Sequence, residues 1–551
     1  MAASTPPRAG NKRPVRKKKD RAAEIANTFE WLITAFILAF VFRAFVMEAF
    51  RIPTGSMADT LMGAHWQLRC PQCGYRYEFG YTSPGRSRGA EDTIPLGPRP
   101  VGQPTRCPSC GYYTPPDGQA MTIPVANGDR ILVFKCIYQF TDPKRWDVIV
   151  FKNPTDPTEN YIKRLIGLPG ETVEIVDGDI YINGQIARKP AQVQKELWMP
   201  VYDNDFRPVN PNLQGAFNGH TWRPPFDFGA SAWKIDEQNP TRLILDRPAD
   251  EINTLTYGAP SANDFTVAYA YNELGLLSRA HDCNDLMMRF YVRPQDREGQ
   301  IGISLTSHGV EYQASVRLSG TMTLAKVEGN KPTEFLAMSI KPPAPGEYTL
   351  MKFAVVDRQL LFAFGDAEMK KDLGGARPTD APQPAPKIPP GGAIFGSGKL
   401  TLSHVALFRD IYYTDGSENP VTSAERAIEG KPFTLNADEF FALGDNSPNS
   451  SDGRYWHQPA PATKGTEPPR AGVVPRYYLV GKALFVYWPS GFEFPWPAAL
   501  KMGLLSHVEA NQRNAPLRLL YTLVSLRWIP NFGQMRFIYG GENGQDQETV
   551  D

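Results

Sequence analysis

A long apolar stretch near the N-terminus constrains the fold of this chain more than any other feature. Residues 29–47 are almost entirely apolar and are interrupted only by Glu30 and Arg43. A stretch of about 18–20 apolar residues is near the minimum for a helix that crosses a bilayer, and Arg43 is close enough to its end to reach the interface. A cleaved signal peptide is the alternative, but the residues after Phe45 offer no Ala-x-Ala site. We therefore expect a retained membrane anchor.

The segment that precedes the apolar stretch is strongly basic. Its first 25 residues contain eight lysines and arginines, against Asp20 and Glu24 alone. Such a run can mimic a nucleic-acid-binding arm, but its position beside the anchor favours a cytoplasmic tail under the positive-inside rule. The net charge of the whole chain is only +1 and indicates no nucleic-acid partner. We expect the chain after about residue 48 to lie on the outer face of the membrane.

The remainder of the chain is predicted to be mainly β, in two to four domains. Short apolar or alternating runs predict the strands of one core at 131–134, 147–151, 172–175, 180–182 and 479–488. A second set of strand-like runs lies in a large insertion, at 265–269, 286–292, 350–356, 360–364 and 400–408. Many short strands with turn signals favour a β-sandwich, here of the jelly-roll kind found in lectin and laminin-G domains. Residues 367–393 are expected to form an exposed loop within it.

Ser56 and Lys163 are the candidate reacting residues. Ser56 lies on a turn directly after the anchor, and Lys163 lies in an apolar, strand-like run. A serine hydroxyl needs a base beside it, and a lysine can serve when burial lowers its pKa. Taken singly, each residue has an ordinary interpretation, because most serines on turns are solvated and most lysines in strands lie at an edge.

Four sequence blocks occur in the order found in the type I signal peptidases, the Ser/Lys proteases that remove signal peptides from exported proteins. The blocks are residues 53–61, 128–135, 161–170 and 442–456. The chain resembles this family over about 120 residues, with both large insertions outside the match. The resemblance implies a β-rich catalytic core, no cofactor for catalysis, and secretory preproteins with small residues before the cleavage site as substrates.

The resemblance also implies roles for particular residues. Ser56 would be the nucleophile and Lys163 the general base, while the Ser56 N–H and the Thr54 hydroxyl would form the oxyanion hole. Such donors stabilise the negative charge that develops on the scissile carbonyl oxygen. The supporting residues that the family pattern implies are Ser450, which would orient the lysine, and Asp452 and Arg454, a pair that would brace the loop.

Three positions depart from the family pattern. Asp59 stands where the family often has proline, Gly453 where it usually has serine, and His457 where it usually has glycine. None of these changes removes a reacting group, so we expect activity to be retained. The penicillin-binding and β-lactamase families place lysine three residues after serine, and Asp59 at that position excludes them. Self-cleaving repressors would carry a DNA-binding domain, and the membrane anchor argues against that class of protein.

Four of the six cysteines form two Cys-x-x-Cys pairs of the zinc-ribbon kind. The pairs are Cys70 with Cys73 and Cys107 with Cys110, each with proline after the first cysteine and glycine after the second. Four thiolates at this spacing suit tetrahedral zinc in a closed structural site. Thiols outside the cytoplasm tend to oxidise, so two disulfides remain the alternative. We favour zinc.

The predicted fold is therefore mainly β: a signal-peptidase-like core with one N-terminal transmembrane helix, an inserted zinc ribbon and an inserted β-sandwich. The predicted segments are a basic cytoplasmic tail (1–26), the anchor (27–48), core segments (49–65, 123–189 and 433–490), the zinc-ribbon-like insertion (66–122), the sandwich insertion (190–432) and a C-terminal extension (491–551). The extension, with possible helices at 497–527, is expected to pack on the core or rest on the membrane.

The predicted function is removal of signal peptides at the cytoplasmic (inner) membrane. We expect a single-pass protein whose catalytic domain faces the periplasm and contacts the lipid bilayer. The alternative is a membrane-anchored scaffold in which residues 190–432 recognise a glycan or a protein and the protease core is inactive or secondary.

Overall fold

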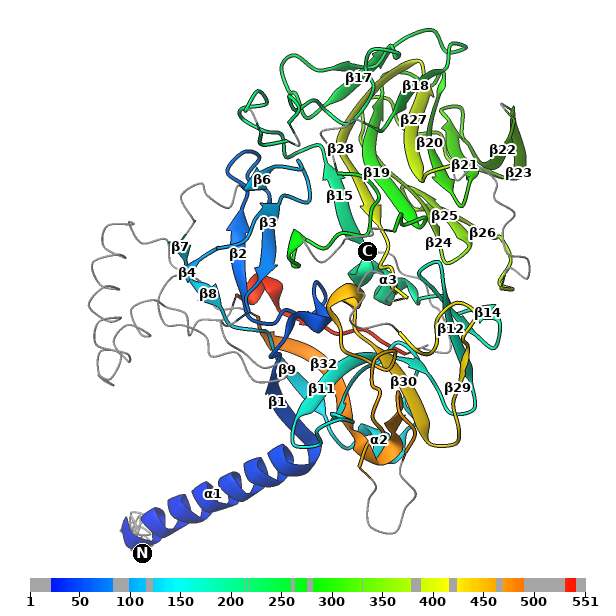
Figure 1. Ribbon diagram of the computed structural model, residues 1–551. Helices are drawn as coiled ribbons and strands as arrows, with labels where there is room; N and C mark the ends of the chain where they lie inside the picture. The colour runs from blue at the N-terminus through cyan, green and yellow to red at the C-terminus, as the bar shows by residue number, and fades with distance from the viewer. Residues whose placement is uncertain are drawn as a thin grey trace, which may run out of the picture.

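The computed structural model confirms a mainly β fold with one long N-terminal helix (Figure 1). The structure describes residues 21–82, 99–114, 122–213, 215–217, 219–258, 263–274, 281–329, 331–377, 388–415, 424–461, 469–489 and 531–541. The helices predicted at 497–527 lie outside the described residues.

The N-terminal helix α1 (Arg21–Val41) continues through the π-helical turn η1 (Phe42–Val46) into strand β1 (Met47–Arg51). It projects away from the rest of the molecule (Figure 1). Residues Glu24–Val46 are long and apolar enough to cross a membrane, with a mean hydropathy of 1.9 and none of the span buried against protein. A helix that is apolar on all sides and unburied suits a lipid environment rather than water.

The predicted core is built on one antiparallel sheet that collects strands from four separate stretches of the chain. Its order is β1, β9 (Arg130–Phe134), β32 (Leu479–Trp488), β10 (Val148–Lys152), β11 (Asn160–Gly167), β30 (Glu439–Leu443) and β31 (Val474–Pro475), with β33 (Arg536–Phe537) pairing with β32. The strands predicted at 131–134, 147–151 and 479–488 are thereby confirmed. Beside this sheet stands a smaller one, β14 (Gln185–Ile186), β13 (Asp179–Ile182), β12 (Thr172–Val176) and β29 (Phe433–Thr434), which confirms 172–175 and 180–182.

The large insertion forms two antiparallel sheets that enclose a hydrophobic core, as expected of a β-sandwich. One sheet has the order β16 (Lys234–Ile235), β17 (Leu243–Asp246), β28 (Lys399–Arg409), β19 (Leu286–Pro294), β24 (Thr349–Val356), β25 (Gln359–Phe364) and β26 (Ala367–Asp372), with β15 (Met199–Asp203) also on β28. The other runs β18 (Asn253–Thr256), β27 (Gly391–Ser397), β20 (Gln300–Ser307), β21 (Val310–Arg317), β22 (Thr321–Glu328) and β23 (Lys331–Ser339). The short helix α3 (Ala191–Leu197) leads into it from the core.

Two expectations for this insertion are wrong. Residues 367–393 are not one loop, because β26 pairs along β25 and β27 begins at Gly391. Residues 265–269 do not form a strand; only an isolated bridge joins Thr266 to Asp282. Phe265, Val267 and Tyr269 are buried, but they pack within the insertion from an irregular segment rather than from a sheet.

The described part of the cysteine-rich insertion contains two short hairpins that carry the cysteines. One joins β2 (His65–Arg69) to β3 (Arg76–Gly80), and the other joins β5 (Thr105–Arg106) to β6 (Tyr113–Thr114). This cysteine-rich insertion, called the ribbon below, shares a continuous hydrophobic core with the sandwich. Trp222 Nε1 of the sandwich donates to the Cys110 carbonyl at 3.1 Å, and Val209 N donates to the Gln72 carbonyl at 2.9 Å. Ribbon and sandwich thus form one packed unit above the catalytic sheet (Figure 1).

Candidate active site

Ser56 lies on η2 (Gly55–Met57), a single 3₁₀ turn that directly follows β1 and residues Ile52–Pro53. Met57 and Leu61 are fully buried beneath this turn, and they belong to the hydrophobic core under the sheet. Because neighbouring residues of the turn point inward, Ser56 is held in a fixed position with only 7% of its surface exposed. The turn therefore supplies a rigid support for a hydroxyl group.

Lys163 lies on β11, between β10 and β30, opposite Ile149 of β10. Every residue of β11 from Ile162 to Gly167 is buried, so Lys163 cannot extend into solvent. Its Nζ lies 2.6 Å from Ser56 Oγ, at hydrogen-bond distance. A base must be within about 2.6–3.2 Å of the proton that it takes. The structure thus brings the two candidate reacting residues together across 107 positions of sequence.

Burial lowers the pKa of Lys163 from 10.5 to about 8. The main cause is desolvation, since a buried ammonium group loses the water that stabilises its charge. The carboxylates of Asp452 and Asp445 oppose the shift, whereas the guanidinium of Arg454 adds to it. Near neutral pH a fraction of Lys163 is therefore neutral and able to accept a proton from a hydroxyl group.

Two buried ion pairs hold the loop that follows β30. Arg164 contacts Asp445 through two hydrogen bonds of 2.8 and 2.7 Å, and Arg454 contacts Asp452 through two of 2.9 and 2.7 Å. All four side chains are at most 1% exposed. Bidentate pairs of this kind fix the relative orientation of both partners. Asp452 and Arg454, the pair that the family pattern implies as a brace for this loop, are in contact.

The same loop contacts the serine turn directly. Asn446 donates its backbone N–H to the Ser56 carbonyl at 3.0 Å and its side-chain amide to the Gly55 carbonyl at 3.0 Å. Gly444 leaves no space for a side chain: a β-carbon there would lie 2.2 Å from Ser450 Oγ and 2.5 Å from the Ser56 carbonyl oxygen. Loop and turn are therefore packed backbone to backbone.

Thr54 and Ser450 have different surroundings. The Thr54 hydroxyl donates a long hydrogen bond of 3.4 Å to Ser56 Oγ. Ser450 is 7% exposed, and its Oγ has no hydrogen-bond partner among the described residues. The expected contact through which Ser450 would orient Lys163 is not formed in this structure, and its role stays a prediction.

The departures from the family pattern have local explanations in two cases. At Gly453 a β-carbon would lie 2.5 Å from the Phe441 ring and 2.8 Å from the Gly472 carbonyl, so the serine usual in the family does not fit here. Asp59 lines an acidic cavity of about 380 Å³ together with Glu78, and burial raises the pKa of Asp59 to about 6. Neither Ser56 nor Lys163 lines this cavity.

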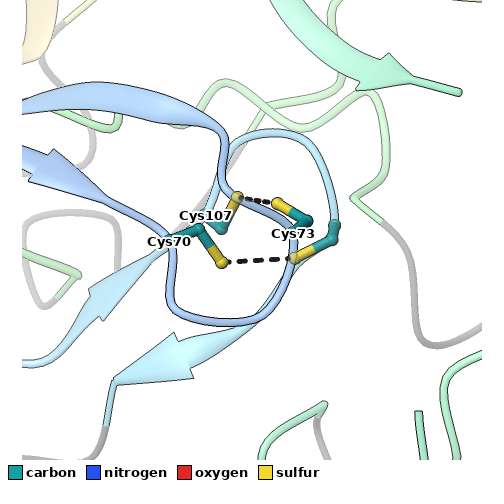
Figure 2. Close-up of side chains that lie close together, drawn as sticks. Cys70, Cys73 and Cys107 are labelled. Carbon is teal, nitrogen blue, oxygen red and sulfur yellow. Dashed lines mark hydrogen bonds between the residues drawn. The ribbon is translucent and has the colours of Figure 1, made fainter. Parts of the chain in front are cut away.

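Figure 2 shows Cys70, Cys73 and Cys107 facing one another at the tips of the two ribbon hairpins. Cys110 belongs to the same group of predicted ligands. Sγ of Cys70 lies 3.7 Å from that of Cys110, and Sγ of Cys73 lies 3.6 Å from that of Cys107. All four sulfurs lie within 4.8 Å of one another. Bonds of about 2.3 Å to a tetrahedral zinc ion would separate the sulfurs by about 3.8 Å. The donor set and its spacing fit one zinc ion.

Two supporting residues were not anticipated from the sequence: Tyr271, which lies beside Gly55 of the serine turn, and Asn272, which contacts Asn446 of the loop. Both belong to the sandwich insertion, and the Asn272 amide exchanges hydrogen bonds with the Asn446 amide at 2.7 and 2.8 Å. A contact between positions 174 residues apart, in a segment outside the family blocks, leaves no local signal in one sequence.

Comparison with known proteins agrees with the site. A sequence profile of the family "Signal peptidase, peptidase S26" matches residues 113–213 and 401–488, which include Lys163 and the Ser450–Arg454 loop but not Ser56. Signal peptidase I of Rickettsia canadensis is 30% identical over 156 residues, 28% of this chain and 42% of that protein. Signal peptidase I of Leptolyngbya laminosa is 35% identical over 125 residues, 20% of this chain and 59% of that protein. The chain spans about half the length of the curated relatives it matches.

Solved structures similar to this chain include carbohydrate binding module CBM66 from Bacillus subtilis, with 8% identity, a TM-score of 0.22, and coverage of 33% of this chain and 94% of that one. A protein of unknown function with a galectin-like fold, also from Bacillus subtilis, has 9% identity, a TM-score of 0.24, and coverage of 39% and 98%. At such TM-scores the likeness carries no information on what the sandwich binds. In its catalytic core, by contrast, the chain resembles the type I signal peptidases, as its sequence blocks predicted.

Proposed function

We propose that this protein is a membrane-bound serine endopeptidase that removes signal peptides from exported preproteins with a Ser56–Lys163 dyad. The observation that carries the proposal is the 2.6 Å contact between Lys163 Nζ and Ser56 Oγ, both buried, in a core that resembles signal peptidase I. A lysine whose pKa is lowered to about 8 can act as a base near neutral pH.

In the proposed mechanism, neutral Lys163 takes the hydroxyl proton of Ser56 while Ser56 Oγ attacks the scissile carbonyl carbon. The developing oxyanion is stabilised by the backbone N–H of Ser56 and the hydroxyl of Thr54. Lys163 then returns the proton to the leaving amine, and the peptide C–N bond breaks to leave an acyl ester on Ser56. A water molecule, deprotonated by Lys163, hydrolyses the ester and regenerates the serine.

The anchor gives this chemistry its location. An unburied apolar helix leads within ten residues into the serine turn, from Val46 to Ser56. The active site is thereby kept close to the membrane, where preproteins still inserted by their signal peptides are available. We place the basic tail in the cytoplasm and the catalytic domain on the periplasmic face, following the positive-inside rule. Substrates with small residues before the cleavage site fit the family resemblance.

We further propose that the ribbon binds one structural zinc ion through Cys70, Cys73, Cys107 and Cys110. The sulfur separations of 3.6 and 3.7 Å support this assignment, and a site with four protein ligands has no open position for a catalytic water. The zinc would therefore stabilise the ribbon and take no part in peptide cleavage.

The test uses the full chain in detergent micelles or liposomes with an authentic preprotein. We expect cleavage after a small residue, and loss of cleavage in Ser56→Ala and in Lys163→Ala. Lys152→Ala, on the neighbouring strand β10, and Ser319→Ala, at an exposed serine of the sandwich, serve as matched controls that keep wild-type activity. A wild type that cuts none of several preproteins, or a Ser56→Ala variant that cuts normally, would contradict the proposal.

A further inference from the structure

The serine turn is enclosed by a segment of the sandwich insertion, residues 263–272, which we call the strap. Its Val267 and Tyr269 are buried in a small cluster with Met199 of the sandwich and Tyr412. The Arg409 guanidinium, 2% exposed on β28, donates to the Ala268 carbonyl. The middle of the strap is therefore held in place by buried packing and by a hydrogen bond to its backbone.

One end of the strap is tied to the cysteine site. The side-chain amide of Asn263 donates to the carbonyls of Cys107 and Val201, each at 3.2 Å. Its own carbonyl accepts a hydrogen bond from Tyr257 Oη at 2.6 Å. Ribbon, sandwich and strap are thus joined at this end by hydrogen bonds to backbone groups.

The other end packs against the catalytic turn. The ring of Tyr271 lies between two glycines: a β-carbon on Gly55 would lie 2.0 Å from Tyr271 Cε1, and one on Gly80 would lie 2.5 Å from it. Tyr271 Oη donates to the Ala64 carbonyl at 3.0 Å, and the Tyr271 carbonyl accepts from Gly80 N at 2.8 Å. The ring covers the peptide that precedes Ser56.

Asn272 completes this contact. Its amide group forms two reciprocal hydrogen bonds with the Asn446 amide, at 2.7 and 2.8 Å, and the two residues are 5% and 0% exposed. Asn446 Nδ2 also donates to the Gly55 carbonyl at 3.0 Å. The pair thus fixes the plane of the Asn446 amide. Together with Ala58 N, which donates at 3.1 Å within the turn, that amide holds the direction of the Gly55 carbonyl.

That carbonyl belongs to the same planar peptide group as the Ser56 N–H, the proposed oxyanion donor. In a trans peptide the C=O and the N–H point in opposite directions and rotate together. A hydrogen bond that holds the Gly55 carbonyl therefore also aims the Ser56 N–H. A donor aimed in advance at the developing oxyanion is worth more than one that must reorient during the reaction.

We propose that Asn272 of the sandwich insertion is a positioning residue of the active site, which acts through Asn446 to orient the Ser56 N–H. Tyr271 supports it by closing the space beside Gly55. The inference rests on the proposed function for its effect on catalysis, whereas its effect on the turn is independent of activity.

The test compares full-length Asn272→Ala with Asn253→Ala, an asparagine of the same insertion whose side-chain amide, among the contacts described, bonds only Glu251. Removing a whole oxyanion donor costs about 10²–10³ in rate, so loss of its alignment is expected to lower kcat about tenfold with KM unchanged. The double variant Asn272→Ala/Asn446→Ala should be no slower than Asn446→Ala alone, because both act in one chain of contacts. Additive losses, or an unchanged kcat in Asn272→Ala, would overturn the proposal.

Hydrogen exchange of a peptide covering residues 50–62 gives a readout that does not need activity. We expect faster exchange in Asn272→Ala and in Tyr271→Ala, with thermal unfolding within a few degrees of the wild type, and no change in Asn253→Ala. If the wild type cleaves no preprotein, the proposed function fails but this exchange still decides the positioning role. Unchanged exchange in both strap variants would refute it.

Discussion

The pH dependence of cleavage tests the catalytic assignment most directly. Only the neutral form of Lys163 can accept the Ser56 proton, and the pKa of Lys163 is about 8. The neutral fraction is then about 1% at pH 6, about 10% at pH 7 and about 90% at pH 9. We expect kcat/KM to rise about tenfold from pH 6 to pH 7 and to level off above pH 9, about 90-fold above its value at pH 6.

The assay measures initial rates of preprotein cleavage in detergent between pH 5.5 and 10, with thermal unfolding recorded at each pH to exclude denaturation. Lys163→Arg is the matched variant, because it keeps a cation at the site but cannot lose its proton. It should be inactive at every pH. Asp452→Asn removes a carboxylate that raises the pKa of Lys163, so it should shift the rise of kcat/KM to lower pH. A kcat/KM that is constant between pH 6 and 9, or that rises only near the ordinary lysine pKa of 10.5, would refute the reasoning.

Four further predictions follow from the site and its supports. Lys163→Met should raise the free energy of unfolding at pH 7 by up to about 3 kcal/mol, because the fall in the Lys163 pKa from 10.5 to about 8 means that its protonated form destabilises the fold. Denaturant titrations should show this gain vanishing as the pH rises from 8 to 10.5. Arg164→Leu should cost about 3–5 kcal/mol because it leaves Asp445 buried and unpaired, and the double variant with Asp445→Leu should recover part of this loss. Gly444→Ala should abolish cleavage with wild-type membrane insertion, because its β-carbon would collide with the Ser56 carbonyl. Purified protein should contain one zinc by elemental analysis, and chelation should expose four thiols in addition to any from Cys136 and Cys283. Cys73→Ser should lower Tm. Absence of metal, with no gain of thiols on chelation, would establish disulfides instead.

The parts of the fold that the sequence revealed are those in which chemistry and local pattern coincide. The strand around Lys163 is a short apolar run between turn signals, and its burial follows from neighbours on both sides. The serine turn, the Gly444–Arg454 loop and the two cysteine pairs each occupy a contiguous block. For such blocks the family pattern, the residue types and the spacing carry the same information.

The parts that escaped prediction depend on long-range packing. Residues 265–269 have the composition of a strand, but their backbone groups find partners in Cys283, His281 and Arg409 instead of a sheet. Tertiary contacts therefore override the local propensity. Residues 367–393 are rich in Ala, Pro, Gly and Lys, which predicts a loop. Their first part instead forms β26, an edge strand on β25, where charged side chains are common.

The strap also bears on whether the sandwich is an accessory module that could be removed. Deletion of residues 190–432 would take away Tyr271 from Gly55 and Asn272 from Asn446, and it would uncover the ribbon face that shares its hydrophobic core with the sandwich. The active site joins groups up to 391 residues apart, so the turn, the loop and the strap must all be in place before Ser56 is fully held. A deletion variant that lost cleavage would therefore not show that the sandwich binds substrate. Point changes at Asn272, which leave the sandwich folded, separate support of the active site from recognition of a ligand.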